Sequence, residues 1–469
     1  MKFQQKKIMQ LMDIIGVFLV ILAVHFVIGA FNGKWPWSGN AYNSYLLQAE
    51  SWLHGRLDLG QNYEYLELAV FKNKYFVSFP PFPSYVLLPF VAILGKQTPE
   101  GWIAFFAMLL GAFYALRIAW HYFGQGAKAI FWTSFLYIGT NVLYITLDAG
   151  VWFIAQNFAL TLSLMAIFYA IQNKGGWSLF FWGCSVGCRP LQIVYFPILF
   201  YILYKNLKQE KPQRTLLSMI KEKYYWAIPV LLIALSYMLL NYARFGNPIE
   251  FGHNYLPEFT REKHGQFHQS YILHNIKSLF RLPQKGENGL LTFYKFDGNC
   301  IFLVIPLFVS YFVYWLRSWI KKQKISPVFT LVLPCLIALH IIGLCAHRTM
   351  GGFHFGHRYI NDVTPYLYWG ILVFAGCITK KTRSEEIAET PITPEKTTEP
   401  VEPATSSQET EEQKATIITE EAQIDSPTNE TEKIEEAIPD YTYPLHIAFC
   451  VFGLALNLIG TIAVNMGWV

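Results

Sequence analysis

Acidic residues gather in a polar stretch between the first two long apolar spans of the chain. Glu64 and Glu67 precede a segment rich in aromatic residues and lysine that ends at Pro81. A carboxylate held near a membrane surface can take the proton from an acceptor hydroxyl as that hydroxyl attacks an anomeric carbon. The alternative is a loop acid surrounded by water. Glu50 and Asp58, earlier in the same stretch, are further acidic candidates.

A lone aspartate, Asp148, lies in the short turn 147–150 between two apolar spans. Aspartate often caps the helix that follows it, because its side chain accepts hydrogen bonds from amides that have no partner within the helix. The same position also suits a catalytic or metal-binding carboxylate. Both interpretations are compatible with the sequence.

Arg189 precedes Pro190 and separates two short apolar stretches, with no acid near it in the sequence. Charged groups at membrane depth are costly, so they are functional candidates by default. A guanidinium group binds phosphate through paired hydrogen bonds, and a lipid-linked phosphate would lie at this depth. The structural alternative is an arginine that reaches back to the lipid headgroups.

The fourth candidate is the glycine-rich segment 351–365, which leads into another apolar span. It contains Arg358 and Asp362, which are four residues apart and would share a face if they lay on an α-helix. A structural bridge between them is therefore the alternative to anion binding by Arg358. His357 and Tyr359 flank this arginine.

The polar segments also contain seven histidines, whose spacings match no pattern of metal ligands. We therefore predict no metal-binding residue and no cofactor, although a divalent metal is left open. These histidines are His253, His264, His268, His274, His347, His354 and His357.

The composition is that of a membrane protein. The hydrophobic fraction is 53% and the charged fraction only 15%, whereas soluble domains carry about 25% charged residues. The formal charge of +5 is modest and lies in short clusters between apolar stretches, so no nucleic-acid partner is expected. We predict an all-α, polytopic transmembrane helical bundle of about eleven spans. The predicted spans are 11–31, 102–121, 127–146, 152–171, 177–188, 190–204, 225–242, 299–319, 327–346, 359–378 and 444–466.

Positive charges in short loops predict the orientation of the bundle. With the N-terminus inside, the basic linkers fall on the cytoplasmic side, provided that 177–204 is a hairpin of two short helices broken at Arg189. The segments 32–101, 243–298 and 347–358 then lie outside. The first of these is expected to carry a helix in the membrane interface near 42–54, and a juxtamembrane helix that ends near Gly95.

The composition changes after the tenth span. From about Ser384 to Tyr441 the chain consists largely of Glu, Thr, Pro and Ser, which cannot bury enough apolar surface to fold. We predict a catalytic module over 1–378, a disordered acidic cytoplasmic linker over 379–443 and a final transmembrane helix over 444–469.

These pieces, in this order, resemble the GT-C superfamily of polytopic glycosyltransferases, which includes bacterial transferases fed by polyprenyl-phosphate sugars. The resemblance covers about residues 10–378 and rests on the acidic first segment with Phe79-Pro-Pro81, on Asp148 and on Arg189-Pro190. Two longer motifs complete it: Asn241-Tyr-Ala-Arg-Phe-Gly-Asn-Pro-Ile-Glu-Phe-Gly252 and Phe355-Gly-His-Arg-Tyr-Ile-Asn-Asp362.

The resemblance implies an inverting transfer from a lipid monophosphate sugar, with an acid of the first outer segment as general base. Many relatives carry an aspartate at the start of that segment, where this chain has Asn40 and Asn43. Glu67 is the preferred base, and Glu64, Glu50 and Asp58 are alternatives. Grouped by role, the predicted residues are Glu67, Glu64 and Asp148 for catalysis, Arg189, Arg358 and His357 for donor phosphate, and Glu50, Tyr359 and Asp362 in support.

The implied function is transfer of a sugar from a polyprenyl-phosphate donor to a glycan, lipid or protein on the outer face of a cell membrane. The implied partners are therefore this donor, an extracytoplasmic acceptor and the lipid bilayer. Two other functions fit a bundle of many spans: a flippase or polymerase for lipid-linked oligosaccharides, and a non-catalytic assembly subunit. Paired half-helices related by internal symmetry would favour transport, and the sequence shows none.

Overall fold

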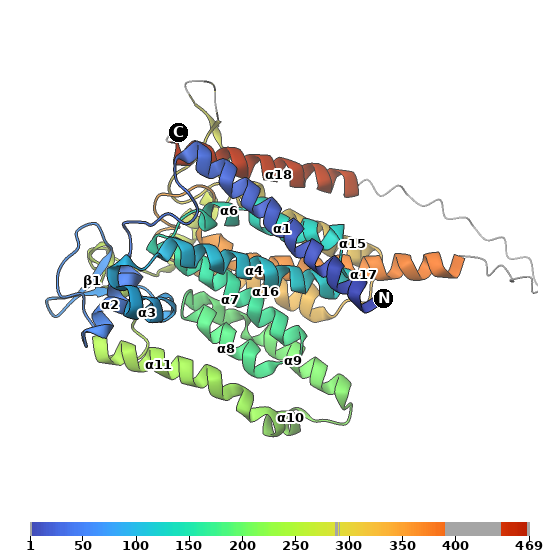
Figure 1. The fold of residues 1–469 in the computed structure, drawn as a ribbon, viewed down its shortest axis with the longest axis horizontal. Helices are drawn as coiled ribbons and strands as arrows, with labels where there is room; N and C mark the ends of the chain where they lie inside the picture. Colours follow the sequence, from blue (N-terminus) through green and yellow to red (C-terminus); the bar gives the residue numbers. More distant parts are fainter. Residues whose placement is uncertain (1, 287–288, 290, 390–441, 467–469) are drawn as a thin grey trace, which may run out of the picture.

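The protein is a bundle of helices that run side by side along one direction (Figure 1). The structure, a computed structural model, describes residues 2–286, 289, 291–389 and 442–466. Each of the eleven predicted spans coincides with one helix or with two consecutive helices of the described residues. Six of the described helices are long and apolar enough to cross a membrane by themselves. The predicted all-α membrane bundle is confirmed.

The helices at the predicted spans include several that are interrupted by a turn or by a short 3₁₀ or π segment. In chain order they are α1 (Lys2–Asn32), α4 (Glu100–Phe123), α5 (Ala127–Ile138), α6 (Val142–Thr146), α7 (Val151–Ile171), α8 (Gly175–Val186), η2 (Pro190–Tyr195), α9 (Phe196–Glu210), α11 (Ala227–Phe245), α14 (Ile301–Val304), α15 (Leu307–Ile320), η5 (Val328–Val332), α16 (Leu333–Cys345), η6 (Tyr359–Val363), α17 (Thr364–Glu389) and α18 (Thr442–Asn465).

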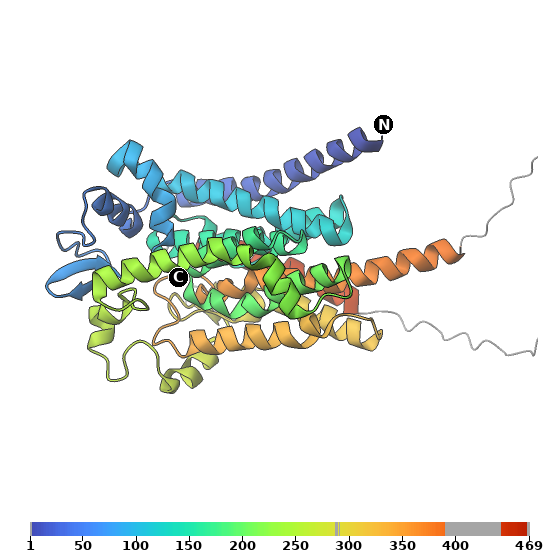
Figure 2. The same ribbon diagram turned by 90° about the horizontal axis from the view of Figure 1, so that it is seen from below.

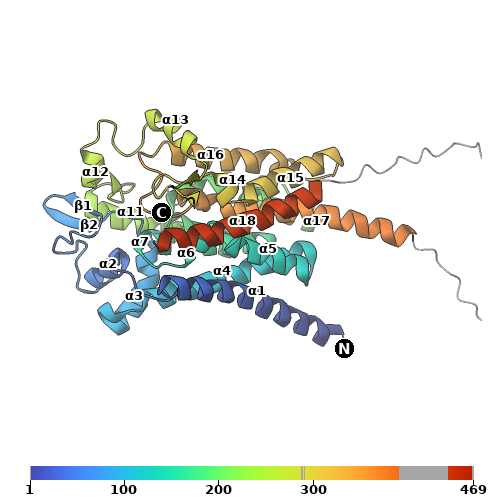
Figure 3. The same cartoon turned by 90° about the horizontal axis from the view of Figure 1, so that it is seen from above.

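The two ends of the bundle carry different structures. The N-terminus, the end of α17 and the start of α18 lie together at one end, and most of the small elements lie at the other (Figures 2 and 3). The small elements are α2 (Ser44–Leu53), β1 (Leu68–Phe71), β2 (Lys74–Val77), α3 (Phe82–Leu94), η1 (Gly95–Gln97), α10 (Leu216–Lys223), η3 (Tyr224–Trp226), η4 (His253–Tyr255), α12 (Pro257–Thr260), α13 (Gln269–Ser278), β3 (Gln284–Lys285) and β4 (Leu291–Thr292). The helices α2 and α3 match the predicted interface and juxtamembrane helices, whereas α10 and η3 belong to the basic linker before α11.

A tight hairpin, β1–β2, fixes the position of Glu67. Lys72 and Asn73 form its turn with φ of 49° and 58°, and a two-residue type I′ turn requires positive φ at both of these positions. Glu67 immediately precedes β1, and its carbonyl oxygen accepts a hydrogen bond from the Ser78 hydroxyl (3.2 Å) just beyond β2. The open end of the hairpin therefore holds this glutamate.

The predicted break between α8 and η2 is present and places Arg189 inside the bundle. Helix α8 has 12 residues, or about 18 Å at 1.5 Å per residue, so the chain turns back within the length of the longer helices. Arg189 is extended (φ −140°), because a residue before proline avoids the helical region. The sequence thus produces an irregular turn among helices, with a charged side chain on it.

Helix α7 lies at the centre of the bundle and is 89% buried over its most apolar window. Two of its polar side chains reach α4: Asn157 donates to the carbonyl of Ala104 (2.7 Å) and Thr161 to that of Ala107 (2.9 Å). Hydrogen bonds of this kind hold transmembrane helices together where burial alone gives little preference. The outer end of α7 carries Trp152 and therefore fixes one wall of the site.

The boundary predicted for the acidic linker differs from the structure. Helix α17 continues to Glu389, past the predicted end of the span at residue 378. The sequence explains this, because no proline follows the apolar stretch until Pro391. Residues 390–441 lie outside the described part of the chain, as does the prediction made for them.

The hairpin formed by α8, η2 and α9 predicts which loops face the cytoplasm. A cysteine placed at exposed Gln213, in the basic linker after α9, should react with a membrane-impermeant maleimide only in permeabilised cells. A cysteine at exposed Gln61, in the first outer segment, should react in intact cells. The background variant lacks Cys335, which is exposed. Labelling of position 213 in intact cells would show that 177–204 crosses the membrane once.

Candidate functional site

Two adjoining chambers lie among the small elements at the end of the bundle opposite the N-terminus, the end predicted to be the outer one. The smaller, about 270 Å³, surrounds Arg189 and is named the arginine chamber. The larger, about 630 Å³, contains Glu67, Asp148 and Arg358 and is named the acidic chamber. The chambers share five wall residues, Phe79, Trp152, His253, His347 and Tyr359. A single ligand could therefore extend from one chamber into the other.

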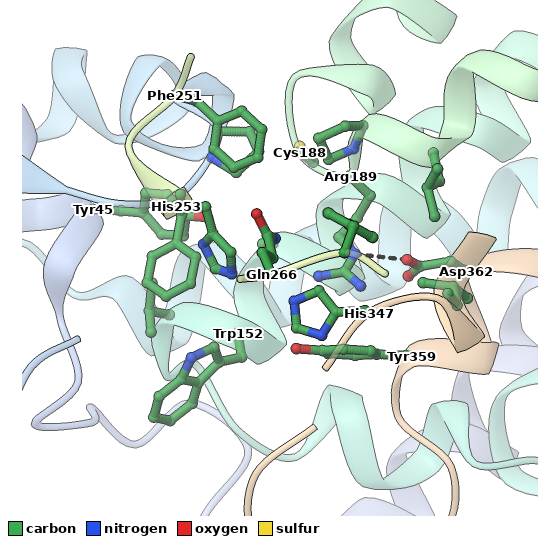
Figure 4. Close-up of a pocket in the computed structure, with 18 residues that line it drawn as sticks. Tyr45, Trp152, Cys188, Arg189, Phe251, His253, Gln266, His347, Tyr359 and Asp362 are labelled. Carbon is green, nitrogen blue, oxygen red and sulfur yellow. Dashed lines mark hydrogen bonds and ion pairs between the residues drawn. The ribbon is translucent and has the colours of Figure 1, made fainter. Parts of the chain in front are cut away.

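The arginine chamber has largely apolar walls around one ion pair, that of Arg189 and Asp362. Beyond the shared residues it is lined by Tyr45, Pro80, Val151, Ala155, Cys188, Arg189, Pro190, Leu191, Phe251, Gln266, Phe267, Leu344 and Asp362. Nε of Arg189 donates to Oδ2 of Asp362 at 2.6 Å, and the guanidinium lies 5.0 Å from the centre of the Tyr359 ring (Figure 4). Among the described residues no side chain or carbonyl bonds its two terminal nitrogens. These N–H groups can bind an anion in the chamber.

The predicted alternative, in which Arg358 pairs with Asp362, is wrong. Asp362 pairs with Arg189 instead. The reason is local: residues 359–363 form the 3₁₀ segment η6, which has about three residues per turn, so positions four apart do not share a face. Gln156 of α7 completes the arrangement by donating both to Oδ1 of Asp362 (3.1 Å) and to the carbonyl of Arg358 (2.8 Å).

Arg358 is buried without a hydrogen-bonding partner for part of its guanidinium. Its side chain lies among three aromatic rings, at 5.6 Å from Trp152, 5.6 Å from Phe153 and 5.1 Å from Tyr359. Only 3% of the residue is exposed, and its Nε and Nη1 bond to none of the described residues. A buried unpaired donor of this kind requires an explanation, and an anion bound in the acidic chamber would supply the missing acceptors.

Glu67 contacts the same tryptophan. Its Oε2 accepts a hydrogen bond from the indole N–H of Trp152 (2.9 Å), while the face of that indole lies against Arg358. One indole therefore contacts both the carboxylate and the guanidinium. Oε1 of Glu67 has no hydrogen-bonding partner among the described residues and is available to a ligand.

Asp148 lies in the acidic chamber but is engaged by its own neighbours. Oδ2 pairs with Nζ of Lys34 at 2.7 Å, and Oδ1 accepts from the Asn40 amide and from the N–H of Gly150. The N-cap of α7 is Gly150, with no side-chain capping bond, so Asp148 does not cap that helix. Both oxygens are already hydrogen-bonded, which makes Asp148 a weaker candidate for proton transfer than Glu67.

The other predicted acids lie outside the two chambers. Glu64 lines an outer groove of about 400 Å³ that it shares with Glu67 and Glu258. Glu50 pairs with Lys96 at 3.6 Å, and Asp58 with Lys74 at 3.8 Å.

His357 is fully buried against the loop before α14, where a side chain on Gly298 would collide with its ring. It is not among the described residues that line the arginine or the acidic chamber. The structure thus brings together Glu67, Asp148, Arg189, Arg358, Tyr359 and Asp362, and separates Glu50, Glu64 and His357 from them.

Two histidines that the sequence did not single out line both chambers. The rings of His253 and His347 face each other with their centroids 5.9 Å apart (Figure 4). Burial lowers the pKa of His253 to about 3 and that of His347 to about 4, so both are neutral at physiological pH. Nδ1 of each lies within hydrogen-bond distance of a backbone carbonyl, at Ser78 (3.1 Å) and Thr349 (2.7 Å). Nδ1 of His347 also lies 3.1 Å from the N–H of Thr349, so only in His253 do the contacts make Nδ1 the donor and Nε2 an acceptor for ligand hydroxyls.

Glu258 is a second acid of the site that sequence reasoning missed. It lies on α12 and lines both the acidic chamber and the outer groove. Burial, and then the nearby charge of Glu67, raise the pKa of Glu258. No signal in the sequence places α12 beside the first outer segment, because the two lie almost 200 residues apart. Among the described residues, no three His, Cys, Asp or Glu side chains are arranged to hold a metal ion.

No family model and no curated protein matches the chain. Among solved structures, it is similar to ArnT from Cupriavidus metallidurans in the apo state, with a TM-score of 0.44, 14% identity, and coverage of 79% of this chain and 61% of that one. A structure of the same ArnT bound to undecaprenyl phosphate gives a TM-score of 0.42 and 13% identity, with coverage of 81% and 63%. The chain therefore spans about three fifths of the length of the structures that it matches, and a similarity this distant assigns it no activity.

The raised pKa of Glu258 predicts a pH-dependent effect on stability. A carboxyl whose pKa is higher in the folded chain than its ordinary value of 4.5 destabilises the fold once the pH exceeds that value. Glu258→Gln, which is always neutral, should therefore raise the Tm at neutral pH, and the difference from wild type should vanish below the ordinary pKa.

Thermal melts in detergent, one at neutral pH and one below the ordinary pKa of 4.5, measure this effect. Glu262→Gln is the matched control, because it removes a neighbouring carboxylate that pairs with Arg348 at 2.7 Å, and it should leave the Tm unchanged or lower it. An equal gain in Tm at both pH values would contradict the assignment to Glu258 ionisation.

Proposed function

We propose that the chain is a membrane glycosyltransferase that moves a sugar from a polyprenyl-phosphate donor to an acceptor outside the cytoplasm. One observation carries the proposal: the carboxylate of Glu67 and the buried guanidinium of Arg358, whose Nε and Nη1 have no partner among the described residues, contact the same indole. An anion-binding group and a base held close to each other, beside an apolar chamber, suit a lipid-linked sugar phosphate. In such a donor the attacked anomeric carbon is bonded directly to a phosphate oxygen. The motifs that resemble the GT-C superfamily support the same assignment.

The donor phosphate would bind between the two arginines. Arg189 offers its terminal N–H groups from the arginine chamber, with its orientation fixed by Asp362. Arg358 offers Nε and Nη1, which lack acceptors among the described residues. The apolar walls of the arginine chamber would hold the first isoprenoid units, and the acidic chamber would hold the sugar. Nε2 of His253 would accept a hydrogen bond from one of its hydroxyls.

The proposed reaction needs one proton transfer from the acceptor. A hydroxyl of the acceptor approaches through the outer groove, and Glu67 takes its proton as the hydroxyl oxygen bonds to the anomeric carbon. The bond between that carbon and the phosphate oxygen breaks, and its electron pair leaves with the polyprenyl phosphate. Attack opposite the leaving group would invert the anomeric centre.

Replacement of the proposed base should remove turnover and spare binding. General-base catalysis contributes about a hundredfold to ten-thousandfold to rate, so Glu67→Gln should lower kcat by that range, while the Kd for donor changes little. The measurement is release of polyprenyl phosphate by purified protein from a panel of polyprenyl-phosphate sugars. Glu50→Gln, which removes an acid paired with Lys96 outside the chambers, is the matched control and should retain its rate.

Three outcomes of this assay separate the alternatives. Wild-type turnover in Glu67→Gln combined with loss in Glu64→Gln would transfer the role of base to Glu64. Translocation of a lipid-linked oligosaccharide without donor cleavage by the wild-type protein would support a flippase instead. Failure to bind or cleave any donor of the panel would favour a non-catalytic subunit.

Replacement of the unpaired arginine should instead weaken donor binding. Arg358→Ala removes charge-assisted hydrogen bonds, and the Kd for donor should rise roughly tenfold to a hundredfold. Arg214→Ala is the control, because Arg214 lies in the basic linker after α9, lines neither chamber and pairs with Glu222 at 2.7 Å. Binding is measured by displacement of a labelled polyprenyl phosphate. An unchanged Kd in a correctly folded Arg358→Ala would leave this arginine a purely structural residue.

A further inference from the structure

The motif 241–252, at the start of the second predicted outer segment, has no part in the proposed reaction. It begins near the end of α11 and runs up to η4, and the end of α11 lies beside the hairpin β1–β2 (Figure 1). Arg244 and Phe245 of this motif are buried, at 4% and 5% exposed. Neither is among the described residues that line the two chambers or the outer groove. Any role of these two residues in the reaction must therefore act through other residues.

The guanidinium of Arg244 binds the end of the hairpin. Its Nη1 donates to the carbonyl of Val77 (3.1 Å), the last residue of β2, and its Nη2 donates to Oδ1 of Asn241 (2.8 Å). Both acceptors are amide oxygens, and a hydrogen bond from a charged donor is stronger than one between neutral groups. Asn241, the first residue of the motif, thus orients the guanidinium that fixes the end of β2.

The end of the hairpin that Arg244 binds is the end that carries Glu67. Val77 lies opposite Leu68 in the register of the two strands, and Leu68 directly follows Glu67. Ser78, the next residue after Val77, donates its hydroxyl to the Glu67 carbonyl (3.2 Å), and its own carbonyl lies 3.1 Å from Nδ1 of His253. The second outer segment therefore holds two successive carbonyls, those of Val77 and Ser78, immediately beside the proposed base.

The same motif also covers one face of the hairpin. The ring of Phe245 packs against those of Phe71 and Phe76, with centroid distances of 5.6 and 5.2 Å. Gly252 passes close to this cluster with φ of 106°, and a side chain on it would press on the Phe245 ring. The hairpin is thus fixed by packing on one face and by hydrogen bonds at its open end.

We propose that Arg244 is a positioning residue for the transfer reaction, which fixes the open end of the hairpin and thereby holds the carboxylate of Glu67 at Trp152. This inference rests on the proposed function, in which Glu67 is the base. A misplacement of about 1 Å in a reacting group can lower a rate about a hundredfold. Loss of Arg244 should therefore affect kcat, while the phosphate site at Arg189 and Arg358 stays intact.

The first test replaces the guanidinium by an apolar group. Arg244→Met removes the hydrogen bonds to Val77 and Asn241, and its kcat for donor cleavage should fall about tenfold to a hundredfold while the Kd for donor changes little. Hydrogen exchange read by mass spectrometry should also become faster at the amides of residues 68–77. Arg214→Met is the matched control, because that side chain is only 10% exposed and pairs with Glu222. It should change neither kcat nor exchange in the hairpin.

A second variant tests the same connection with a smaller change. Ser78→Ala removes only the hydroxyl that donates to the Glu67 carbonyl. It should lower kcat about fivefold, the shift that loss of one ordinary hydrogen bond produces, again with little change in Kd. Ser178→Ala is the matched control and should keep the wild-type rate, because it removes an equally buried hydroxyl that donates to the carbonyl of Ala166 (2.8 Å) in the bundle.

Four outcomes would overturn the proposal, and they separate it from the proposed function. Unchanged hairpin exchange in folded Arg244→Met would show that the hairpin is held without this arginine. A wild-type kcat in Arg244→Met and Ser78→Ala, while Glu67→Gln loses turnover, would reject the positioning role and leave the base in place. A rise in Kd that accounts for the whole loss of rate would assign Arg244 to donor binding. Full turnover in Glu67→Gln would reject the base itself, whereas the exchange data would still report whether Arg244 fixes the hairpin.

Discussion

The ion pair between Arg189 and Asp362 joins two segments that are 173 residues apart, and it leaves a second guanidinium beside them without a carboxylate. Asp362 is 2% exposed and Arg189 20% as side chains, so both charges have left most of their water. Removing one partner of a buried pair typically costs about 3 to 5 kcal/mol, because the other charge stays uncompensated. Asp362 spares Arg189 this cost, whereas Arg358 has no carboxylate partner among the described residues. Three aromatic rings surround Arg358 instead, those of Trp152, Phe153 and Tyr359.

Irregular backbone is the means by which these charges are positioned. The chain is broken between α8 and η2 at Arg189, and the segment around Arg358 is an irregular loop followed by the 3₁₀ turn η6. Non-helical backbone at membrane depth is tolerated only where it is buried in protein or lines a cavity. Asn141, in the turn between α5 and α6, supplies hydrogen bonds to this irregular backbone. Its side chain donates to the carbonyl of Phe355 and accepts from the N–H of His357. Gly356 is required there, because any side chain on it would collide with Asn141.

The sequence predicts the bundle better than it predicts the contacts of the site. Apolar windows and proline positions are local signals, and they locate the spans and the break at Arg189. The partner of Asp362 is not a local property, and the four-residue spacing to Arg358 suggested the wrong pair because the helix type at 359–363 was unknown. Glu258 and His253 carry no motif of their own. They join the site because the second outer segment folds over the first, a long-range event that spacing within one segment cannot reveal. Gln156 lies inside an apolar span, where an amide side chain is also typical of an ordinary interhelical contact. The sequence therefore gives no sign that this amide belongs to the site.

The distribution of charge fits the proposed reaction. Asp362 balances Arg189, and Lys34 balances Asp148, which leaves Arg358 and Glu67 in contact with the same indole, that of Trp152. A lipid-linked sugar phosphate is a diester with a single negative charge, and the phosphate monoester that leaves carries a second one. In the proposed transfer, the proton that Glu67 accepts removes one negative charge from the site while the departing phosphate gains one. The total charge of the site is unchanged, and the new charge appears beside the guanidinium that lacked an acceptor. Groups that are already in place where charge develops need no reorganisation during the reaction, which is the main advantage of such a fixed arrangement.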